Sequence, residues 1–182
     1  MINPKTIRVT PNILLKQIEL ADAEDIFHTI NNQRTYLGKW LPFVAQTKTL
    51  EDTKQFIRSV ADTPEKQREY VFVIHYNSKF AGLIGFRDTD RQNMKTEIGY
   101  WLSKHFQKKG IITQSMRALV DFAFDELEMN RVQVKCAVAN YASKNIPQRL
   151  GFQKEGIERD GELLTDGKFT NLEIYSLLKR DR

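Results

Sequence analysis

Apolar positions with a period of two recur along the chain, and polar or glycine-containing segments separate them. Such runs are typical of half-buried strands. Two of them are separated only by "NSK", which predicts a hairpin. The last two flank Asp166-Gly167, a pair that favours a turn. Strands are therefore predicted at 12–18, 69–76, 80–88, 95–103 and 131–138, and in two parts of 152–179.

Between these runs, apolar residues recur at helical spacing. Asp22 and Asn140 are residue types that cap helix N-termini, and Thr49 followed by Asp52 matches a capping box. The segment 34–46 contains glycine and proline and is expected to be irregular despite its many aromatic and aliphatic residues. Helices are therefore predicted at 22–32, at 49–62 with a stop near Pro64, at 112–127 and at 140–151.

This order of elements is a strand, two helices, an antiparallel meander and then a strand–helix–strand–helix–strand–strand series. It predicts an α/β (α+β) fold in one domain, 1–182, and not the regular alternation of a doubly wound sheet. A chain of 182 residues is long enough to bury one sizeable core. No internal repeat, low-complexity segment or linker interrupts it.

The composition and charge of the chain argue against several classes of function but do not indicate one. The net charge of +5 is spread along the chain, so it favours acidic or phosphorylated partners, yet no basic stripe with aromatic residues supports nucleic-acid binding. No apolar run reaches membrane-spanning length, and the N-terminus lacks a signal-peptide core. The single cysteine, Cys136, indicates a reducing compartment, so we expect a cytoplasmic protein. The three histidines are far apart, which argues against a metal site.

The stretch "FQKKGIITQS" places a glycine and two lysines where a long helix is predicted to begin. A helix N-terminus presents unpaired N–H groups and the positive end of the helix dipole, so it binds anions well. Gly110 lets the backbone approach a ligand closely. This stretch alone has two interpretations: a phosphate-binding loop, or a helix start with two solvated lysines. It is neither a Walker P-loop nor a dinucleotide fingerprint.

The neighbouring segments extend this pattern. "EIGYWL" precedes the loop, "ANYASKNIPQRLGF" follows it, and "LGKWLPF" occurs early in the chain. Together they make the chain resemble the GCN5-related N-acetyltransferase (GNAT) superfamily, particularly its RimJ/RimL branch. The resemblance covers nearly the whole chain and implies a mixed, mostly antiparallel twisted sheet flanked by helices.

In that family the loop amides hold the pyrophosphate of acetyl-CoA, and the strand before the loop pairs with its pantetheine arm. The resemblance therefore assigns the arm to Tyr100, Trp101, Leu102 and Asn140. It assigns the pyrophosphate to Gln107, Lys108, Lys109, Gly110, Ile111 and Ile112. The family prefers a small residue at the position of Ile112. Its branched side chain is expected either to point into the core, leaving the amides free, or to tighten the loop.

Acetyl transfer needs a neutral amine, a polarised carbonyl and a proton for the leaving thiolate. The resemblance makes Glu97 the candidate base; the alternative is an exposed glutamate at a strand edge. It makes Ser143 the candidate proton donor; the alternative is a residue that only completes a helix cap. Pro147 lies four residues after Ser143, so its ring should disturb the helix at that serine. Cys136 lies in an alternating strand and is expected to be a core residue.

The acceptor side is expected to include Trp40 and Phe43 from the early aromatic loop. The resemblance implies a protein N-terminus as acceptor, of the ribosomal-protein type. A small amine, such as a polyamine, aminoglycoside or amino acid, is the alternative, although the acidic residues expected around a polyamine are scattered. A non-catalytic acetyl-CoA-binding module is a third reading. Relatives often form homo-oligomers through sheet edges or C-terminal strands; no metal, membrane or direct nucleic-acid partner is expected.

Overall fold

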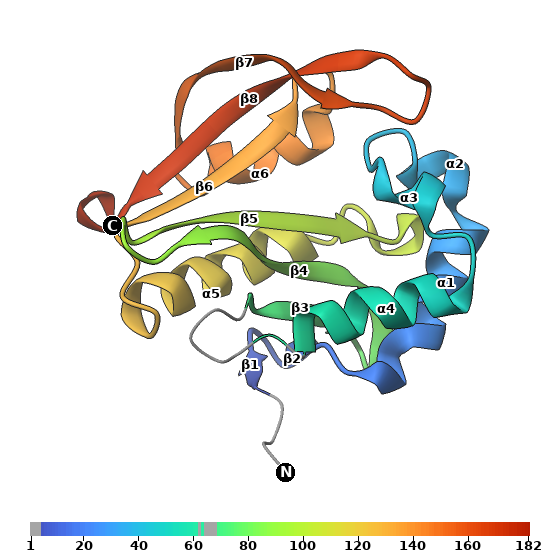
Figure 1. Ribbon diagram of the computed structural model, residues 1–182. Coiled ribbons are helices and arrows are strands. Elements are labelled where there is room, and N and C mark those ends of the chain that lie inside the picture. The colour runs from blue at the N-terminus through green and yellow to red at the C-terminus, as the bar shows by residue number, and fades with distance from the viewer. Residues whose placement is uncertain (1–4, 62, 64–68) are drawn as a thin grey trace.

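The computed structural model describes residues 5–61, 63 and 69–182, which form one mixed sheet with helices on both faces (Figure 1). The described strands lie in the order β1-β2-β3-β4-β5-β6-β8-β7. All neighbours are antiparallel except β5 and β6, so the predicted mixed α/β fold with a mostly antiparallel sheet is confirmed. The strands are β1 (Thr6–Arg8), β2 (Ile13–Gln17), β3 (Val71–Tyr76), β4 (Lys79–Asp90), β5 (Lys95–Leu102), β6 (Arg131–Ala137), β7 (Gln153–Leu163) and β8 (Phe169–Leu178).

Helices cover the two faces of the sheet unequally. One apolar cluster joins the four early helices to the sheet through residues such as Ile26, Ile57 and Trp101. A larger cluster joins the later helices to the opposite face, with Met116 and Phe72 buried in it. The early helices are α1 (Ala23–Asn32), α2 (Arg34–Leu37), α3 (Phe43–Gln46) and α4 (Leu50–Ala61); the later ones are α5 (Ile111–Asp125) and α6 (Tyr141–Arg149).

Two of the predicted helix caps are confirmed. The Thr49 hydroxyl accepts a hydrogen bond from the Asp52 N–H at 3.3 Å, and the Asp52 carboxylate accepts one from the Thr49 N–H at 2.7 Å. The Asn140 side chain accepts from the Ser143 N–H. Asp22 differs, because its carboxylate accepts from the Glu19 N–H and closes a 3₁₀ turn that precedes α1. The expected helix stop near Pro64 lies outside the described residues.

The short elements β1, α2 and α3 were not predicted. The segment 34–46, expected to be irregular, contains α2 and α3, each a single turn. β1 is also only three residues long. One helical turn or three strand residues are too short to show a hydrophobic period, so the pattern could not reveal them.

The sheet opens between its only parallel pair among the described strands. β5 and β6 pair only where Lys95–Glu97 lies beside Arg131–Gln133. Beyond that point β5 continues along β4, while β6 stays paired with β8. Figure 1 shows the two strands separating from a common end. This opening, together with the loop before α5 and the start of α6, positions the site.

Candidate active site

Two cavities adjoin the opening between β5 and β6. The first, here called the loop cavity, has a volume of about 420 Å³ and lies between the end of β5, the loop 106–110 and the starts of α5 and α6. The second, the sheet cavity, has a volume of about 820 Å³ and extends from β4 and β5 to α3, α4 and β7. Both are lined by Trp40, Leu41, Tyr100, Trp101, Asn140 and Ser143. The two cavities therefore meet at the opening.

Backbone geometry at the mouth of α5 fits an anion. Gly110 is the residue before the helix and has φ +70°, in the left-handed region that glycine adopts without strain. The first N–H groups of a helix have no partner within it. Within the described residues, no other group accepts from the N–H groups of 108–112. Ile111 and Ile112 have buried side chains, so the first expectation for Ile112 is met: it packs into the core.

The polar side chains of this loop are partly occupied. Gln107 donates from Nε2 to the Tyr36 hydroxyl at 2.6 Å. The Lys109 ammonium lies 5.1 Å from the ring centre of Tyr76, within the range of a cation–π contact. Both Lys108 and Lys109 line the loop cavity and are exposed. The loop can thus offer backbone N–H groups and positive charge to the same ligand.

The three predicted residues of β5 all line the loop cavity, but they point to different faces of the sheet. Tyr100 and Leu102 pack against the cluster under α5. Trp101 is buried in the cluster under α1–α4, with its ring centre 5.8 Å from that of Phe80. Beyond Glu97, β5 pairs with β4 on one side only. Its backbone groups on the other side are therefore available to an extended ligand, except for the Leu102 carbonyl, which accepts from the Tyr36 hydroxyl at 3.3 Å.

Ser143 lies in the first turn of α6, and its peptide groups are held by side chains on both sides. Its N–H donates to Asn140 Oδ1 at 3.3 Å. Its carbonyl oxygen accepts from the Tyr100 hydroxyl at 3.0 Å. Pro147, inside α6, has no N–H to offer that carbonyl. The Ser143 hydroxyl itself has no hydrogen bond to any described residue, and Ser143 lines both cavities.

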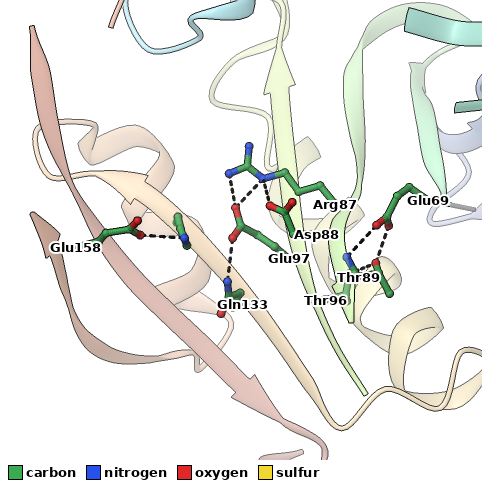
Figure 2. Close-up of polar contacts among 9 residues, drawn as sticks. Glu69, Arg87, Asp88, Thr89, Thr96, Glu97, Gln133 and Glu158 are labelled. Carbon is green, nitrogen blue, oxygen red and sulfur yellow. Dashed lines mark hydrogen bonds and ion pairs between the residues drawn. The ribbon is translucent and has the colours of Figure 1, made fainter. Parts of the chain in front are cut away.

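Glu97 lies at the vertex where β5 and β6 separate (Figure 2). It is 2% exposed, so the alternative of an exposed glutamate is wrong. Oε1 accepts from Arg87 Nε at 2.7 Å and lies 2.5 Å from Arg87 Nη2, while Oε2 accepts from Gln133 Nε2 at 2.9 Å. Glu97 lines the sheet cavity, with both carboxylate oxygens already bonded.

A second carboxylate, Glu162, also lines the sheet cavity, and the sequence analysis did not single it out. Its side chain makes no hydrogen bond or ion pair with any described residue. Burial raises the pKa of its carboxyl, against a smaller opposite effect of Arg87. Glu162 follows an irregularity in β7 where Asp160 has φ +49° and donates its N–H to Asn171 Oδ1 at 2.8 Å. The Asp160-Gly161 pair, typical of turns, was the available signal inside a strand run.

The predicted acceptor residues Trp40 and Phe43 both lie on the wall of the sheet cavity. Trp40 is half-buried, and Phe43 is exposed. The loop that carries them is connected to the tip of the β7–β8 hairpin, because the Thr165 hydroxyl donates to the Gly38 carbonyl at 2.8 Å. Residues of the hairpin and of the aromatic loop line the same cavity.

Cys136 lies on the wall of the sheet cavity as a buried residue, as expected of a core position. Burial raises the pKa of its thiol to about 12, so the thiolate is not available near neutral pH. Among residues 5–61, 63 and 69–182, no three His, Cys, Asp or Glu side chains are grouped as metal ligands. Across the same residues, no helix has the length and hydropathy needed to cross a membrane.

Comparison with known proteins identifies the class. Residues 12–153 match the model of the acetyltransferase (GNAT) domain. The chain is 37% identical to the putative ribosomal N-acetyltransferase YdaF of Bacillus subtilis, over 97% of this chain and 96% of that protein. It is 27% identical to the ribosomal-protein-serine acetyltransferase of Escherichia coli, over 94% and 96%. The crystal structure of the Microcin C7 self immunity acetyltransferase MccE, in complex with acetyl-CoA and AMP, has a TM-score of 0.89 and 30% identity, over 94% of this chain and 95% of that one.

The fold and the site therefore define an acetyl-CoA-dependent N-acetyltransferase, as the resemblance implied. The chain belongs to the GNAT acetyltransferase family.

Proposed function

We propose that this enzyme transfers the acetyl group of acetyl-CoA, bound in the loop cavity, to an amine that enters the sheet cavity. The observation that carries the proposal is the meeting of the two cavities at Tyr100, Asn140 and Ser143. A thioester reaching this junction from one side and an amine reaching it from the other would come into direct contact. Holding two reactants in this way is a large part of catalysis.

In this proposal the pyrophosphate binds in the loop Gln107–Ile112, through the N–H groups of Lys108 to Ile112, and is supported by the charges of Lys108 and Lys109. The unpaired N–H groups at the start of α5 support this position. The pantetheine arm then runs along the open edge of β5, past Tyr100–Leu102, toward Asn140. The lining of the loop cavity by all of these residues supports that course.

Two kinds of side chain serve the chemistry. Ser143 donates a proton to the departing sulfur, since its hydroxyl is free and lies at the junction. A carboxylate on the sheet-cavity wall takes up the amine proton, directly or through water. Glu97 and Glu162 both line this wall, which supports either of them in this role. Glu162 is the better base, because its carboxylate is unbonded and its pKa is raised, whereas Arg87 and Gln133 engage Glu97.

The acceptor we propose is the N-terminal α-amino group of a protein, in the cytoplasm. Two relatives are named for ribosomal proteins, one of them at 37% identity. An α-amino group has a pKa of about 8 and a lysine about 10.4, so neutralising the α-amine costs about 3 kcal/mol less. The sheet cavity carries the carboxylates of Asp52, Glu69, Glu97 and Glu162 against the cations of Arg87 and Lys135, which suits a positively charged amine.

A small amine is the second candidate acceptor. The size of the sheet cavity, about 820 Å³, and its aromatic wall at Trp40 and Phe43 favour it, since such dimensions suit a whole small molecule. MccE, the structural neighbour solved with AMP and acetyl-CoA, carries a nucleotide as well as the donor. A panel of peptide N-termini, spermidine, an aminoglycoside and a free amino acid would separate the two candidates by kcat/KM.

The first experiment is calorimetric titration with acetyl-CoA and CoA. Wild type should bind both, and Gly110→Glu should not, since its carboxylate would repel the pyrophosphate. Gly167→Glu is the matched control. Gly167 has φ +78° in the β7–β8 hairpin turn, so a glutamate there causes similar backbone strain, but far from the loop 106–110. Failure of wild type to bind, or equal loss in both variants, would contradict the proposed acetyl-CoA site.

A further inference from the structure

We propose that Tyr100 is a positioning residue: its hydroxyl takes the hydrogen-bonding place that Pro147 leaves open in α6, and so holds Ser143 at the junction of the two cavities. This inference rests on the proposed role of Ser143 as proton donor. It explains why Pro147 can occur inside α6 and why the Tyr100 hydroxyl faces away from bulk solvent.

The first step is the geometry of α6. In an α-helix the N–H of each residue donates to the carbonyl four residues earlier, so residue 147 would serve the Ser143 carbonyl. Pro147 lacks that N–H. The Ser143 carbonyl instead accepts from the Tyr100 hydroxyl at 3.0 Å. The Tyr100 hydroxyl thus gives this part-buried carbonyl the hydrogen bond that the proline cannot supply.

The second step is where the two residues come from. Tyr100 belongs to β5, and Ser143 belongs to α6, which follows β6. β5 and β6 have already separated at this level, since they pair only as far as Glu97 and Gln133. The Tyr100–Ser143 hydrogen bond therefore crosses the opening of the sheet. It links the wall that would carry the cofactor to the helix that carries the proton donor.

The third step is what this bond constrains. The Ser143 N–H is held by Asn140 and the Ser143 carbonyl by Tyr100, so both peptide groups around its Cα are fixed by side chains. The hydroxyl alone remains free to reorient toward a substrate. Burial raises the pKa of Tyr100 well above 10, so the phenol stays protonated and donates at any working pH. Its other polar neighbour is Cys136 Sγ at 3.9 Å, a weak partner.

The test is a double-mutant cycle on steady-state kinetics. Tyr100→Phe keeps the ring and removes the hydroxyl. We expect kcat to fall about 10-fold or more, since small displacements of a catalytic group are costly, with the KM for acetyl-CoA nearly unchanged. In a Ser143→Ala background the same change should have little further effect, because its target is gone. Tyr70→Phe, a half-buried tyrosine outside both cavities, is the control and should leave kcat unchanged.

A second cycle tests the link to the proline without relying on activity. Pro147→Ala restores an N–H that can serve the Ser143 carbonyl, so Tyr100→Phe should lower the unfolding midpoint less in that background than in wild type. Additive effects in both cycles, or an unchanged kcat in Tyr100→Phe, would overturn the inference while leaving the proposed function intact. Full activity in Ser143→Ala would instead remove the proton-donor role and the inference with it.

Discussion

Two carboxylates on one cavity wall differ in how the chain holds them. Glu97 is enclosed by Arg87 and Gln133, which occupy both of its carboxylate oxygens. Glu162 is half-buried without a hydrogen-bonding partner among the described residues, and burial favours its neutral form. A base needs a pKa near the working pH and a free lone pair, so these environments assign different roles to the same residue type.

We expect Glu162→Gln to lower kcat/KM about 100-fold or more, the usual effect of losing a general base. In wild type the acid limb of the pH–rate profile should lie above the ordinary glutamate pKa of about 4.3, because burial raises it. The variant should lose that limb. Glu97→Gln, measured beside it, should keep the limb; if the limb follows Glu97 instead, the base is assigned to the wrong carboxylate.

The substitution Glu162→Gln should also increase the free energy of unfolding at neutral pH. Glu162 has a raised folded-state pKa, so the folded state binds its proton more tightly than the unfolded state does. The stabilising contribution of the protonated Glu162 carboxyl is present below its unfolded-state pKa and is lost as the pH rises through its folded-state pKa. Glutamine resembles the neutral carboxyl and does not ionise, so its contribution to stability does not fall as the pH rises. Urea unfolding at pH 7 should therefore give a higher midpoint for Glu162→Gln than for wild type, and a lower midpoint would contradict the burial argument.

Cys136 should be nearly inert to thiol reagents in the folded protein. Its pKa of about 12 leaves very little thiolate at pH 8, and its side chain is 4% exposed. Iodoacetamide labelling followed by mass spectrometry should be slow in the native state and fast in urea. Rapid native labelling would show that the opening between β5 and β6 exposes the sulfur.

At the scale of whole elements, β4 and β5 approach each other at a glycine. A Cβ built on Gly82 would lie 2.2 Å from the Trp101 carbonyl oxygen and 2.9 Å from the Leu102 Cα. These atoms belong to the part of β5 that lines the loop cavity. The closeness of the two backbones therefore depends on the absence of a side chain at this position.

Gly82→Ala should accordingly destabilise the fold by about 2 kcal/mol, the typical cost of overpacking, and should also weaken acetyl-CoA binding because β5 must move. Gly156→Ala provides the matched comparison, since nothing lies within 4 Å of a Cβ there. Chemical denaturation and calorimetry would measure the two effects. A Gly82→Ala variant as stable as Gly156→Ala would show that the strands can separate without cost.

Elements with a sustained period or a specific cap could be predicted from the sequence. The hairpin around "NSK", the Thr49–Asp52 box and the Asn140 cap depend on neighbouring residues alone. The single-turn helices α2 and α3 could not be predicted, and the Asp160-Gly161 pair indicated a turn but not an irregularity within a continuing strand. The first are too short for a period, and the second depends on the β8 residue Asn171, which lies across the strand pair.

At the scale of the molecule, the cofactor and acceptor residues were predictable only by resemblance. They come from segments between 40 and 162 that meet because β5 and β6 separate. Loop chemistry alone indicated an anion site. The burial of Glu97 and the placement of Glu162 depend on which strands become neighbours and in what register, and neither is contained in a local pattern.

The ion pair between Arg131 of β6 and Glu155 of β7 should make the free energy of unfolding depend on pH in the acid range. The Arg131 guanidinium, bonded to both Glu155 oxygens at 2.5 Å, lowers the pKa of that carboxyl to about 2. The stabilising contribution of the Glu155 carboxylate is present above its unfolded-state pKa near 4.3 and is lost as the pH falls toward 2. Glu155→Gln should therefore be less stable than wild type at pH 7, and the difference should shrink below pH 4. A difference in unfolding midpoint that is independent of pH would contradict this linkage.

The shared wall of the two cavities has a kinetic consequence. An amine entering from β7 and a thioester entering from α5 would meet without any enzyme nucleophile between them, since Ser143 is proposed to act as a proton donor and Cys136 is buried. Initial rates should therefore give intersecting double-reciprocal lines, the sign of a ternary complex, and not the parallel lines of a ping-pong mechanism. A single molecule joining CoA to the acceptor through its nitrogen would fill both cavities at once. It should inhibit far more tightly than either half, because joining the halves removes the entropy cost of binding the second one.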